Sequence, residues 1–355
     1  MRKKYILITI SFLLGIPNMA ATGLSLLHFE YWWIRIFDYP KLQMIVFMGI
    51  ALLLYLVATR GGALGAKIYP VLLSVTIIYQ LIKIQPYTYF SKLEVLPAEK
   101  NDSLNYFSIV HCNVLMTNRD SEKCLREITK YHPDLILAVE TDTWWQNALK
   151  PLEKEYPYIA FLPLENTYGM LVYSKLKMEN ADFRYLVEND IPSLNPVITL
   201  RSGVKVNCYF IHPKPPAPAE APSSINRDAE LVIVAKSARN STMPVIAAGD
   251  LNDVGWSRTS ELFQKISGLL DPRIGRGLFA TFNANNKFFR WPLDHIFLSK
   301  AFRVVNIQML DDTGSDHFPI YVKLSYEPET AYEQKNINPD KKDLKDAQKK
   351  LDKAK

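Results

Sequence analysis

The chain has 355 residues, of which 48% are hydrophobic, and a formal net charge of +6 at pH 7. This mild charge comes partly from a lysine-rich C-terminal tail, so it does not by itself indicate a nucleic-acid partner. Only three cysteines occur, Cys112, Cys124 and Cys208, too few and too dispersed for a disulfide framework or a zinc site. We expect them in the core. One disulfide between two of them is permitted if the domain lies outside the cytoplasm.

The apolar residues crowd into the first quarter of the chain. Three segments nearly free of charge, Tyr5 to Leu27, Leu42 to Thr59 and Ile68 to Ile84, are each about 17–23 residues long, enough to cross a hydrocarbon core. They predict three transmembrane helices. For the first segment a cleaved signal peptide is the alternative, because a basic start, an apolar stretch and two small residues resemble one. No charged residue lies in mid-span, so we expect residues 1–90 to be a structural anchor.

Basic residues predict the orientation of this anchor. Arg2, Lys3 and Lys4 precede the first helix, and Arg60 and Lys67 lie in the short loop between the second and third helices. Both places are therefore expected in the cytoplasm. The chain after the third helix then lies outside the cytoplasmic membrane, whether or not the first segment is cleaved.

Residues 91–103 are polar and are expected to link the anchor to a soluble domain over 104–326. The domain begins with a predicted strand, Tyr106 to Leu115, which runs apolar and then presents Asn113. A helix over Asp120 to Tyr131 and a second strand, Asp134 to Glu140, follow. Glu140 lies where the apolar run stops. A carboxylate at such depth needs a cation or hydrogen bonds, although an exposed loop glutamate remains the alternative.

The middle of the domain mixes helix and strand signals. We expect a helix over Trp144 to Glu155, a strand over Tyr168 to Ser174, a hairpin over Pro196 to Ile211 that ends at His212, a proline-rich loop at 213–218 and a helix from Asn226 to Arg239.

The clearest signal is the stretch from Met243 to Asp253, an apolar run that stops at Gly249 and continues into oxygen-bearing side chains. It predicts a buried strand that delivers Asp250 and Asn252 to its exposed end, where together they could hold a cation and a phosphate. Taken alone, an ordinary turn is the simpler interpretation.

The remaining predicted elements are a helix from Ser257 to Gly268, a strand from Leu293 to Leu298, a loop with Ser315, Asp316 and His317, a last strand from Ile320 to Tyr326, and a charged tail over 327–355, disordered or marginally helical.

Taken in order, these fragments resemble one family. Asn113 in His-Cys-Asn-Val, Glu140 in Leu-Ala-Val-Glu, His212 in Ile-His-Pro, Asp250 and Asn252 in Gly-Asp-Leu-Asn, Asp294 in Leu-Asp-His-Ile, and Ser315-Asp316-His317 are similar to the motifs of the endonuclease/exonuclease/phosphatase superfamily. That superfamily includes DNase I-like nucleases, neutral sphingomyelinases and inositol polyphosphate phosphatases. The resemblance covers about 105–324, and a short membrane-anchored bacterial branch looks most similar.

The resemblance implies an α/β fold, a four-layer sandwich of two facing mixed β-sheets flanked by helices, preceded by the transmembrane helices. It also implies a role for each motif residue. Glu140, Asn113 and Asp316 would bind Mg²⁺ or Mn²⁺; Asp250, His317, Asp294 and His212 would be catalytic; and Asn252, Asn113 and Arg290 would hold the phosphate. Either Asp250 or His317 would take the proton of the attacking water, and His212 would be a second cationic donor. Arg290 is a candidate from its position four residues before Asp294, and a surface position is the alternative. His111 could face the site because it precedes Asn113 by two, although a packed strand histidine is the preferred interpretation. His295 is assigned to structure and Asp253 to the turn.

The sequence therefore predicts a membrane-anchored, metal-dependent phosphodiesterase with its site outside the cytoplasm. Tethering next to a bilayer favours a lipid headgroup or another envelope phosphodiester as substrate, and DNA or RNA, cleaved by a tethered nuclease, is the alternative. A binding protein that keeps the fold without the reaction is a third possibility. It is disfavoured because every expected polar position is filled.

Overall fold

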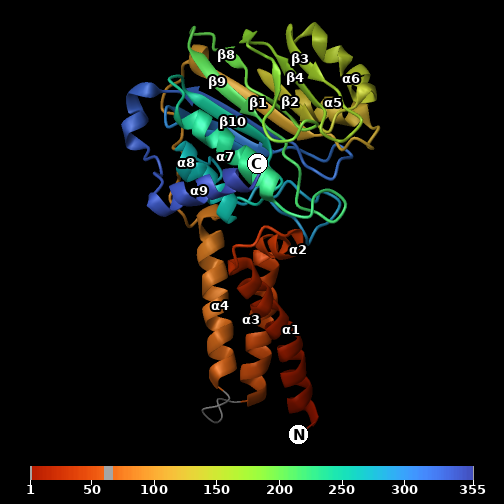
Figure 1. The fold of residues 1–355 in the computed structure, drawn as a ribbon, viewed down its shortest axis with the longest axis vertical. Coiled ribbons are helices and arrows are strands. Elements are labelled where there is room, and N and C mark those ends of the chain that lie inside the picture. The colour runs from red at the N-terminus through yellow and green to blue at the C-terminus, as the bar shows by residue number, and fades with distance from the viewer. Residues whose placement is uncertain (1, 60–66, 355) are drawn as a thin grey trace.

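The structure, a computed structural model, describes residues 2–59 and 67–354. It has two parts, an apolar helical stem and an α/β domain that follows it in the chain (Figure 1). Arg60, one of the basic residues used to predict the orientation, lies outside the described residues.

The stem consists of three long helices, α1 (Arg2–Leu26), α3 (Lys41–Thr59) and α4 (Ile68–Ile84), which pack side by side (Figure 1). Each is long and apolar enough to cross a membrane. Pro17 lies inside α1 without ending it. Buried polar side chains join the helices, since the Gln80 amide donates a hydrogen bond to the Thr22 hydroxyl over 2.8 Å.

The domain contains two β-sheets. The six-stranded sheet has the order β12 (Phe302–Met309), β13 (Ile320–Tyr326), β1 (Tyr106–Asn113), β2 (Leu135–Val139), β4 (Met170–Ser174) and β3 (Tyr158–Leu162). The second sheet runs β11 (Asp294–Leu298), β10 (Val245–Asp250), β9 (Lys205–Phe210), β7 (Pro192–Leu194) and β6 (Phe183–Tyr185), and β8 (Val197–Thr199) joins β9 to β5 (Met178–Glu179). The parallel pairs are β1 with β2 and β9 with β10. Both sheets are therefore mixed.

Alternation along the strands explains the layers. On β1, Phe107 and Ile109 belong to the core between the two sheets, whereas Val110 and Cys112 pack under the helices of the first sheet. Those helices are α5 (Ser121–Thr129) and α6 (Thr143–Ala148), while α7 (Ile225–Arg239) and α8 (Arg258–Ser267) cover the outer face of the second sheet (Figure 1). This arrangement confirms the predicted sandwich of two facing sheets flanked by helices.

One predicted helix is interrupted. The segment from Trp144 to Glu155 was expected to be continuous, but α6 ends at Ala148 and a 3₁₀ turn, η5 (Lys150–Lys154), follows. Pro151 lies in the first positions of that turn, where its missing N–H cannot continue the α-helical ladder. The other short 3₁₀ turns are η1 (Ile36–Asp38), η3 (Gln85–Tyr87), η4 (Ser103–Asn105) and η6 (Pro328–Glu333).

The C-terminal tail, expected to be disordered or marginally helical, is helical over much of its length. It contains a helix, α9 (Lys341–Lys353), which packs against α7 and α8 with Ala347 fully buried. Four long-range ion pairs hold the helix. Three join it to the domain, Lys265 with Asp343, Arg258 with Asp346 and Lys350 with Asp228, and the fourth joins Lys353 to Glu30 in the segment between α1 and α3. The tail is charged, as its composition shows, but its charges meet partners on the domain.

The stem and the domain are joined closely. The segment between α1 and α3 contains the one-turn helix α2 (Trp32–Arg35), and Trp256 of the domain donates its indole N–H to the Asp38 carbonyl over 2.7 Å. The expected linker at 91–103 also packs on the domain, because Val95 is fully buried in the core between the sheets. The segment between α1 and α3 and the segment 91–103 therefore both pack against the domain.

Candidate active site

Polar side chains replace apolar ones where the inner faces of both sheets reach one edge. On β1, the inward positions Phe107 and Ile109 are followed at the same period of two by His111 and Asn113. On β10, Ile246 and Ala248 are followed by Asp250, and on β11 Asp294 precedes Ile296 and Leu298. The same alternation that builds the apolar core thus delivers the polar cluster to its edge.

The strand register brings Asp250 and Asp294 opposite each other. They are paired residues of the antiparallel ladder between β10 and β11. His212 follows β9, which runs parallel to β10, and its Nε2 lies 4.0 Å from Asp250 Oδ2. Gly249 makes this approach possible, because a Cβ at its position would lie 1.8 Å from the Ile211 carbonyl oxygen and its φ is +150°.

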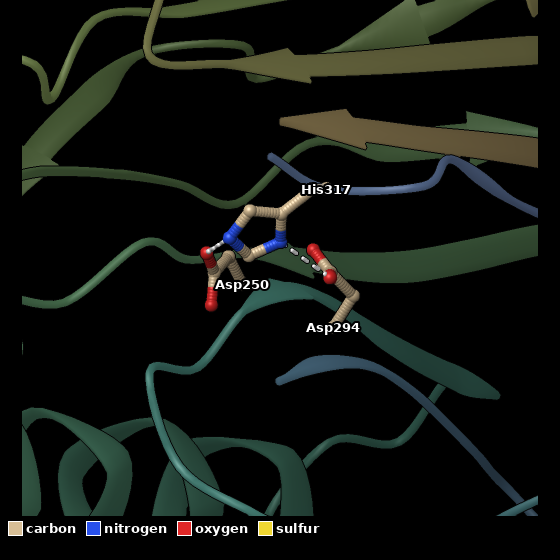
Figure 2. Close-up of side chains that lie close together, drawn as sticks. All are labelled: Asp250, Asp294 and His317. Atoms are coloured by element: carbon tan, nitrogen blue, oxygen red, sulfur yellow. Dashed lines mark hydrogen bonds and ion pairs between the residues drawn. The ribbon is translucent and has the colours of Figure 1, made fainter. Parts of the chain in front are cut away.

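His317 lies between the two aspartates (Figure 2). Its Nδ1–H donates to Asp294 Oδ2 over 2.8 Å, and its Nε2 is 3.5 Å from Asp250 Oδ2. The loop that carries it is fixed by Ser315, whose hydroxyl donates to the Asn113 carbonyl oxygen and accepts the His317 backbone N–H. The other Asp294 oxygen accepts a hydrogen bond from His111 Nε2 over 2.7 Å.

The charges in this group reinforce one another. Burial alone would raise the pKa of Asp294, but His317 and His111 outweigh it and hold that pKa well below its usual range. Burial likewise would lower the pKa of His317, yet Asp294 and then Asp250 raise it to about 10. At neutral pH, therefore, a charged imidazolium is held between two buried carboxyl groups.

Asp250 is poised differently from Asp294. Burial raises its pKa to about 6, although the nearby His317 opposes the shift. Its Oδ1 accepts the backbone N–H of Asn252 over 2.9 Å, and its Oδ2 accepts the Asn113 amide over 3.2 Å. Asn252 itself has a left-handed backbone with a φ of +53°, and its side-chain amide donates to the Pro213 carbonyl oxygen over 3.0 Å. The turn after β10 is thereby tied to the proline-rich loop.

Glu140 follows β2 at the same edge and is joined to the cluster by Asn113. The Asn113 amide donates to Glu140 Oε1 over 2.7 Å, so it bridges Glu140 and Asp250. Burial raises the pKa of Glu140 to about 7, opposed by Asn113 and His317 and supported by Asp250 and Asp316. Its φ of +59° is an uncommon conformation for a glutamate, held here at the end of a buried strand.

Two donor sets at this edge fit a divalent cation by their chemistry. The predicted set of Glu140, Asn113 and Asp316 offers carboxylate and amide oxygens. In addition, the ligand atoms of Asp250, Asp294 and His317 all lie within 4.8 Å of one another. The raised pKa of Glu140 supports the fit, because a cation would compensate a carboxylate that burial leaves poorly solvated.

His212 and Arg290 have surroundings that bear on their predicted roles. Burial lowers the pKa of His212 to about 3, with His111 and His317 adding to the shift, so its imidazole is neutral rather than cationic. It packs at 5.2 Å from the Tyr168 ring. Arg290 donates to the carbonyl oxygens of Ala284 and Asn286 and lies over the Phe318 ring. These contacts fix Arg290 in the loop next to His317 and use part of its hydrogen-bonding capacity.

From the sequence, His111 could face the site, although a packed strand histidine was the preferred interpretation, and Asp253 was assigned to the turn. The position of His111 two residues before Asn113 was the available signal, since both must face the same side of β1. Asp253 is buried and pairs with Arg227 over 3.0 Å. His295 was assigned to structure, and it is enclosed by Arg273 and the Asp253 carbonyl oxygen.

The comparisons with known proteins agree with this geometry. A model of the endonuclease/exonuclease/phosphatase family matches residues 110–317. The chain belongs to this family. Its members are generally hydrolases that act on phosphoester bonds and usually depend on a divalent metal. The resemblance inferred from the motifs is thereby confirmed. No curated protein matches the chain.

Solved structures show the family fold at low sequence identity. D. rerio TDP2 in complex with a single-strand DNA product has a TM-score of 0.52 and 18% identity, covering 62% of this chain and 99% of TDP2. A family protein from Beutenbergia cavernae has a TM-score of 0.50 and 16% identity over 63% of this chain and 72% of its own. SmcL has a TM-score of 0.50 and 14% identity over 62% and 99%.

Proposed function

We propose that the chain is a membrane-anchored, metal-dependent phosphodiesterase that uses water to hydrolyse phosphodiester bonds outside the cytoplasm. The observation that carries the proposal is the His317 imidazolium, bonded to buried Asp294 on one side and facing Asp250 across 3.5 Å on the other. Phosphoryl transfer needs a base or orienting group for water and positive charge at the phosphoryl oxygens. This edge of the sandwich offers both.

Asp250 is the candidate base. Its Oδ1 is held by the Asn252 backbone N–H, which leaves Oδ2 directed toward Asn113 and His317. A pKa raised to about 6 leaves Asp250 ionised at neutral pH while keeping it a better proton acceptor than an ordinary aspartate. We assign to Asp250 the orientation and deprotonation of the attacking water.

His317 is the candidate donor to the phosphoryl group. Its Nδ1–H is committed to Asp294, whereas its Nε2–H faces Asp250 Oδ2 across 3.5 Å, so Nε2–H is available to a phosphoryl oxygen that enters between them. His111 holds Asp294 from the other side, so the carboxylate keeps its orientation when the imidazolium charge is shared with substrate. Asn113 and Asn252 would contribute amide dipoles to the same phosphate without adding negative charge.

The metal would be held by Glu140, with Asn113 and Asp316 completing the oxygen ligands that the chain supplies. We prefer this set to that of Asp250, Asp294 and His317, because both oxygens of Asp294 accept short hydrogen bonds from histidines, whereas among the described residues Glu140 Oε2 accepts only the Met116 N–H at 3.4 Å. Asn113 Oδ1 accepts the Leu115 N–H over 3.0 Å and would offer its second lone pair to the cation. A bound Mg²⁺ or Mn²⁺ supplies charge neutralisation for the phosphate.

A phosphodiester of the membrane surface is the favoured substrate class. The turn after β10 lies against the stem, since the hydroxyl of Tyr39, in the segment between α1 and α3, donates to the Asn252 carbonyl oxygen over 2.8 Å. The loop that carries Arg290 also reaches the stem, where Gln43 at the start of α3 donates to the Phe288 carbonyl oxygen over 2.6 Å. Phe288 is 82% exposed there. An exposed aromatic ring beside the end of an apolar helix suits a membrane interface.

Nucleic acid is the second candidate, because D. rerio TDP2 holds a single-strand DNA product in a related fold. The two candidates differ in their salt dependence. DNA binding through phosphate contacts weakens steeply as the salt concentration rises, so the rate of DNA cleavage should fall with it. Hydrolysis of a lipid headgroup should instead require micelles or vesicles. The full chain in detergent, offered single-strand DNA and phospholipid vesicles over a salt series, separates them.

The reaction is tested with the full chain in detergent on a generic aryl phosphodiester with Mg²⁺ or Mn²⁺. Chelation should abolish turnover, and Glu140→Gln and His317→Asn should each reduce kcat by roughly 10²–10⁴-fold. Glu122→Gln and His132→Asn make the same chemical changes at exposed positions and should leave the rate unchanged. Turnover that persists without metal, or unaffected site variants, would contradict the mechanism.

The orientation rests on the distribution of basic residues along the stem. Lys3, Lys4 and Lys67 all lie at the end of the stem far from the domain, where α1 begins and α4 begins (Figure 1). The positive-inside rule then places the domain outside the cytoplasm. We therefore expect that, of reporters fused to the C-terminus of the full chain, those that function only outside the cytoplasm are active. A reporter that works only in the cytoplasm would reverse the assignment.

A further inference from the structure

A second cavity lies at the junction of stem and domain, away from the site described above. Its volume is about 300 Å³, and it is lined by Leu26 at the end of α1, Lys41 at the start of α3, Lys83 near the end of α4 and several residues of α8 and α9. Three stem helices thus reach the cavity with the ends that face the domain (Figure 1). If the stem spans a bilayer, the cavity lies at the level of the lipid headgroups.

The unusual feature of this cavity is Lys41. Its side chain is 2% exposed, although lysine is almost never fully buried without a partner. Within residues 2–59 and 67–354, its ammonium makes no hydrogen bond and no ion pair. The ring centroid of Tyr79 lies 5.8 Å from the ammonium, and the charges of Asp38 and Glu261 act on it without forming an ion pair. A buried ammonium of this kind is costly unless an anion compensates it.

The acidic residues around the cavity compensate the Lys41 charge only in part, because Asp38 and Glu261 act on it electrostatically but form no ion pair with it. Four acidic residues are already paired with basic ones, Asp38 with Arg35, Glu261 with Lys83, Asp343 with Lys265 and Asp346 with Arg258. The fifth, Asp340, caps the first turn of α9 through the Asp343 N–H. Each of these acidic side chains is therefore already bonded to a group within the protein. Among the described residues, the Lys41 ammonium has no directly bonded anion, and it lies at the N-terminal end of a 19-residue helix whose dipole also favours an anion.

We propose that this cavity binds the phosphate of an anionic phospholipid, with Lys41 as its principal ligand. The ammonium would donate charge-assisted hydrogen bonds to the phosphate oxygens. The acyl chains would leave along the stem, where Leu26 lines the cavity and is itself 50% exposed. The inference rests on the membrane placement in the proposed function, but it does not depend on catalysis. The lipid here is a bound component of the anchor and lies in a different cavity from the substrate.

Native mass spectrometry of the detergent-solubilised full chain tests the proposal. In the presence of a chelator, which prevents turnover, we expect one phosphatidylglycerol to remain bound and phosphatidylcholine to be retained at least about tenfold less. Lys41→Met should weaken phosphatidylglycerol binding by roughly tenfold or more, the loss expected for charge-assisted hydrogen bonds. Lys41→Arg keeps the charge and should retain the lipid.

Lys92→Met is the control, because Lys92 is exposed in the segment that follows α4 and does not line the cavity. It should bind lipid like the unmodified chain. The melting temperature should rise with phosphatidylglycerol in the unmodified chain and in Lys92→Met but not in Lys41→Met. Equal lipid retention by Lys41→Met would overturn the proposal. So would stabilisation by inorganic phosphate but not by phosphatidylglycerol, which would indicate a soluble anion.

The two proposals fail in distinguishable ways. Loss of lipid binding with metal-dependent turnover intact would remove only the lipid site. Lipid retention in a chain that never hydrolyses a phosphodiester would remove only the catalytic proposal.

Discussion

Asp294 is the residue that determines the charge state of the site. Both of its carboxylate oxygens accept hydrogen bonds from histidines, and its negative charge is the largest favourable influence on the pKa of His317. Asp294→Asn keeps the size of the side chain but removes this charge. We expect the pKa of His317 to fall from about 10 toward the ordinary histidine value, and kcat to fall by roughly 10²–10³-fold.

The His317 ring can be followed by NMR titration, with the aryl phosphodiester assay run on the same samples. Asp312→Asn is the control, because Asp312 is an exposed aspartate at the surface of the domain. An Asp294→Asn variant in which His317 still titrates at its original pKa would show that Asp294 does not hold the imidazolium.

Gly249 decides whether β9 and β10 can approach closely enough to bring His212 to Asp250. In Gly249→Ala the new methyl would meet the Ile211 carbonyl at 1.8 Å, so the strands must separate. We expect a loss of roughly 1–3 kcal/mol in stability from backbone strain, with a further loss from the displaced ladder. Gly203→Ala is matched to it, since Gly203 also has a positive φ, of +86°, but nothing lies within 4 Å of a Cβ there.

Differential scanning calorimetry of the two variants in detergent compares their melting temperatures and so isolates the steric contribution to stability. Gly203→Ala should cost about 1 kcal/mol or less. Equal melting temperatures for the two variants would mean that close approach of the strands contributes nothing beyond the backbone conformation.

At the scale of elements, α7 carries a buried acid that makes stability depend on pH. Glu230 is 3% exposed and accepts a hydrogen bond from the Ser193 hydroxyl of β7 over 2.5 Å. Burial raises the pKa of Glu230 from 4.5 to about 7. A carboxyl whose folded pKa lies above its unfolded pKa favours the folded state while it is protonated. Its ionisation therefore destabilises the fold as pH rises from about 4.5 through about 7.

Glu230→Gln should remove this penalty and keep the Ser193 hydrogen bond. We expect the variant to match the unmodified chain near pH 4 and to exceed its stability by about 3 kcal/mol above pH 8. Melting temperatures across this pH range, with Glu122→Gln as an exposed control, measure the difference. A gap between Glu230→Gln and the unmodified chain that does not widen with pH would mean that Glu230 ionises freely in the fold.

The elements that sequence could and could not predict differ in a physical way. The buried central strands were predictable, because β1, β2 and β10 are apolar runs that stop at Asn113, Glu140 and Asp250. The edge strands β3 and β12 were not predicted, because an edge strand is half exposed and its pattern is weak. The docking of α9 was also missed, since its ion pairs join residues far apart in sequence and its buried stripe contains little more than Ala347.

Within the site, residue types were predictable but their partners were not. The motifs nominated His317 and Asp294, and the two are hydrogen-bonded. The pairing of His111 with Asp294 depends on how the two sheets face each other, and no spacing along the chain encodes that distance. For the same reason the sequence suggested a cationic His212, whereas complete burial among other histidines makes it neutral.

For the whole molecule, the stem contributes directly to the site. The segment between α1 and α3 supplies Tyr39, whose hydroxyl bonds the Asn252 carbonyl oxygen, and Arg35, which lies 3.9 Å from Asp253. Arg227 of α7 donates to the same Asn252 carbonyl oxygen over 2.6 Å. The turn after β10 is thus held from the stem and from the domain together. A fragment that starts after the stem would keep every motif residue but lose half of this support.

Tyr39→Phe tests this contribution without removing any part of the chain. The variant loses one hydrogen bond to a site-loop carbonyl, worth about 1 kcal/mol, so we expect a lower melting temperature and a several-fold lower kcat on a soluble aryl phosphodiester. Tyr31→Phe is the matched control, since it makes the same change in the same segment and the Tyr31 hydroxyl has no hydrogen bond to any described residue. If both variants keep full activity, the stem tethers the domain without shaping its site. If only Tyr39→Phe loses rate, the anchor is part of the catalytic structure.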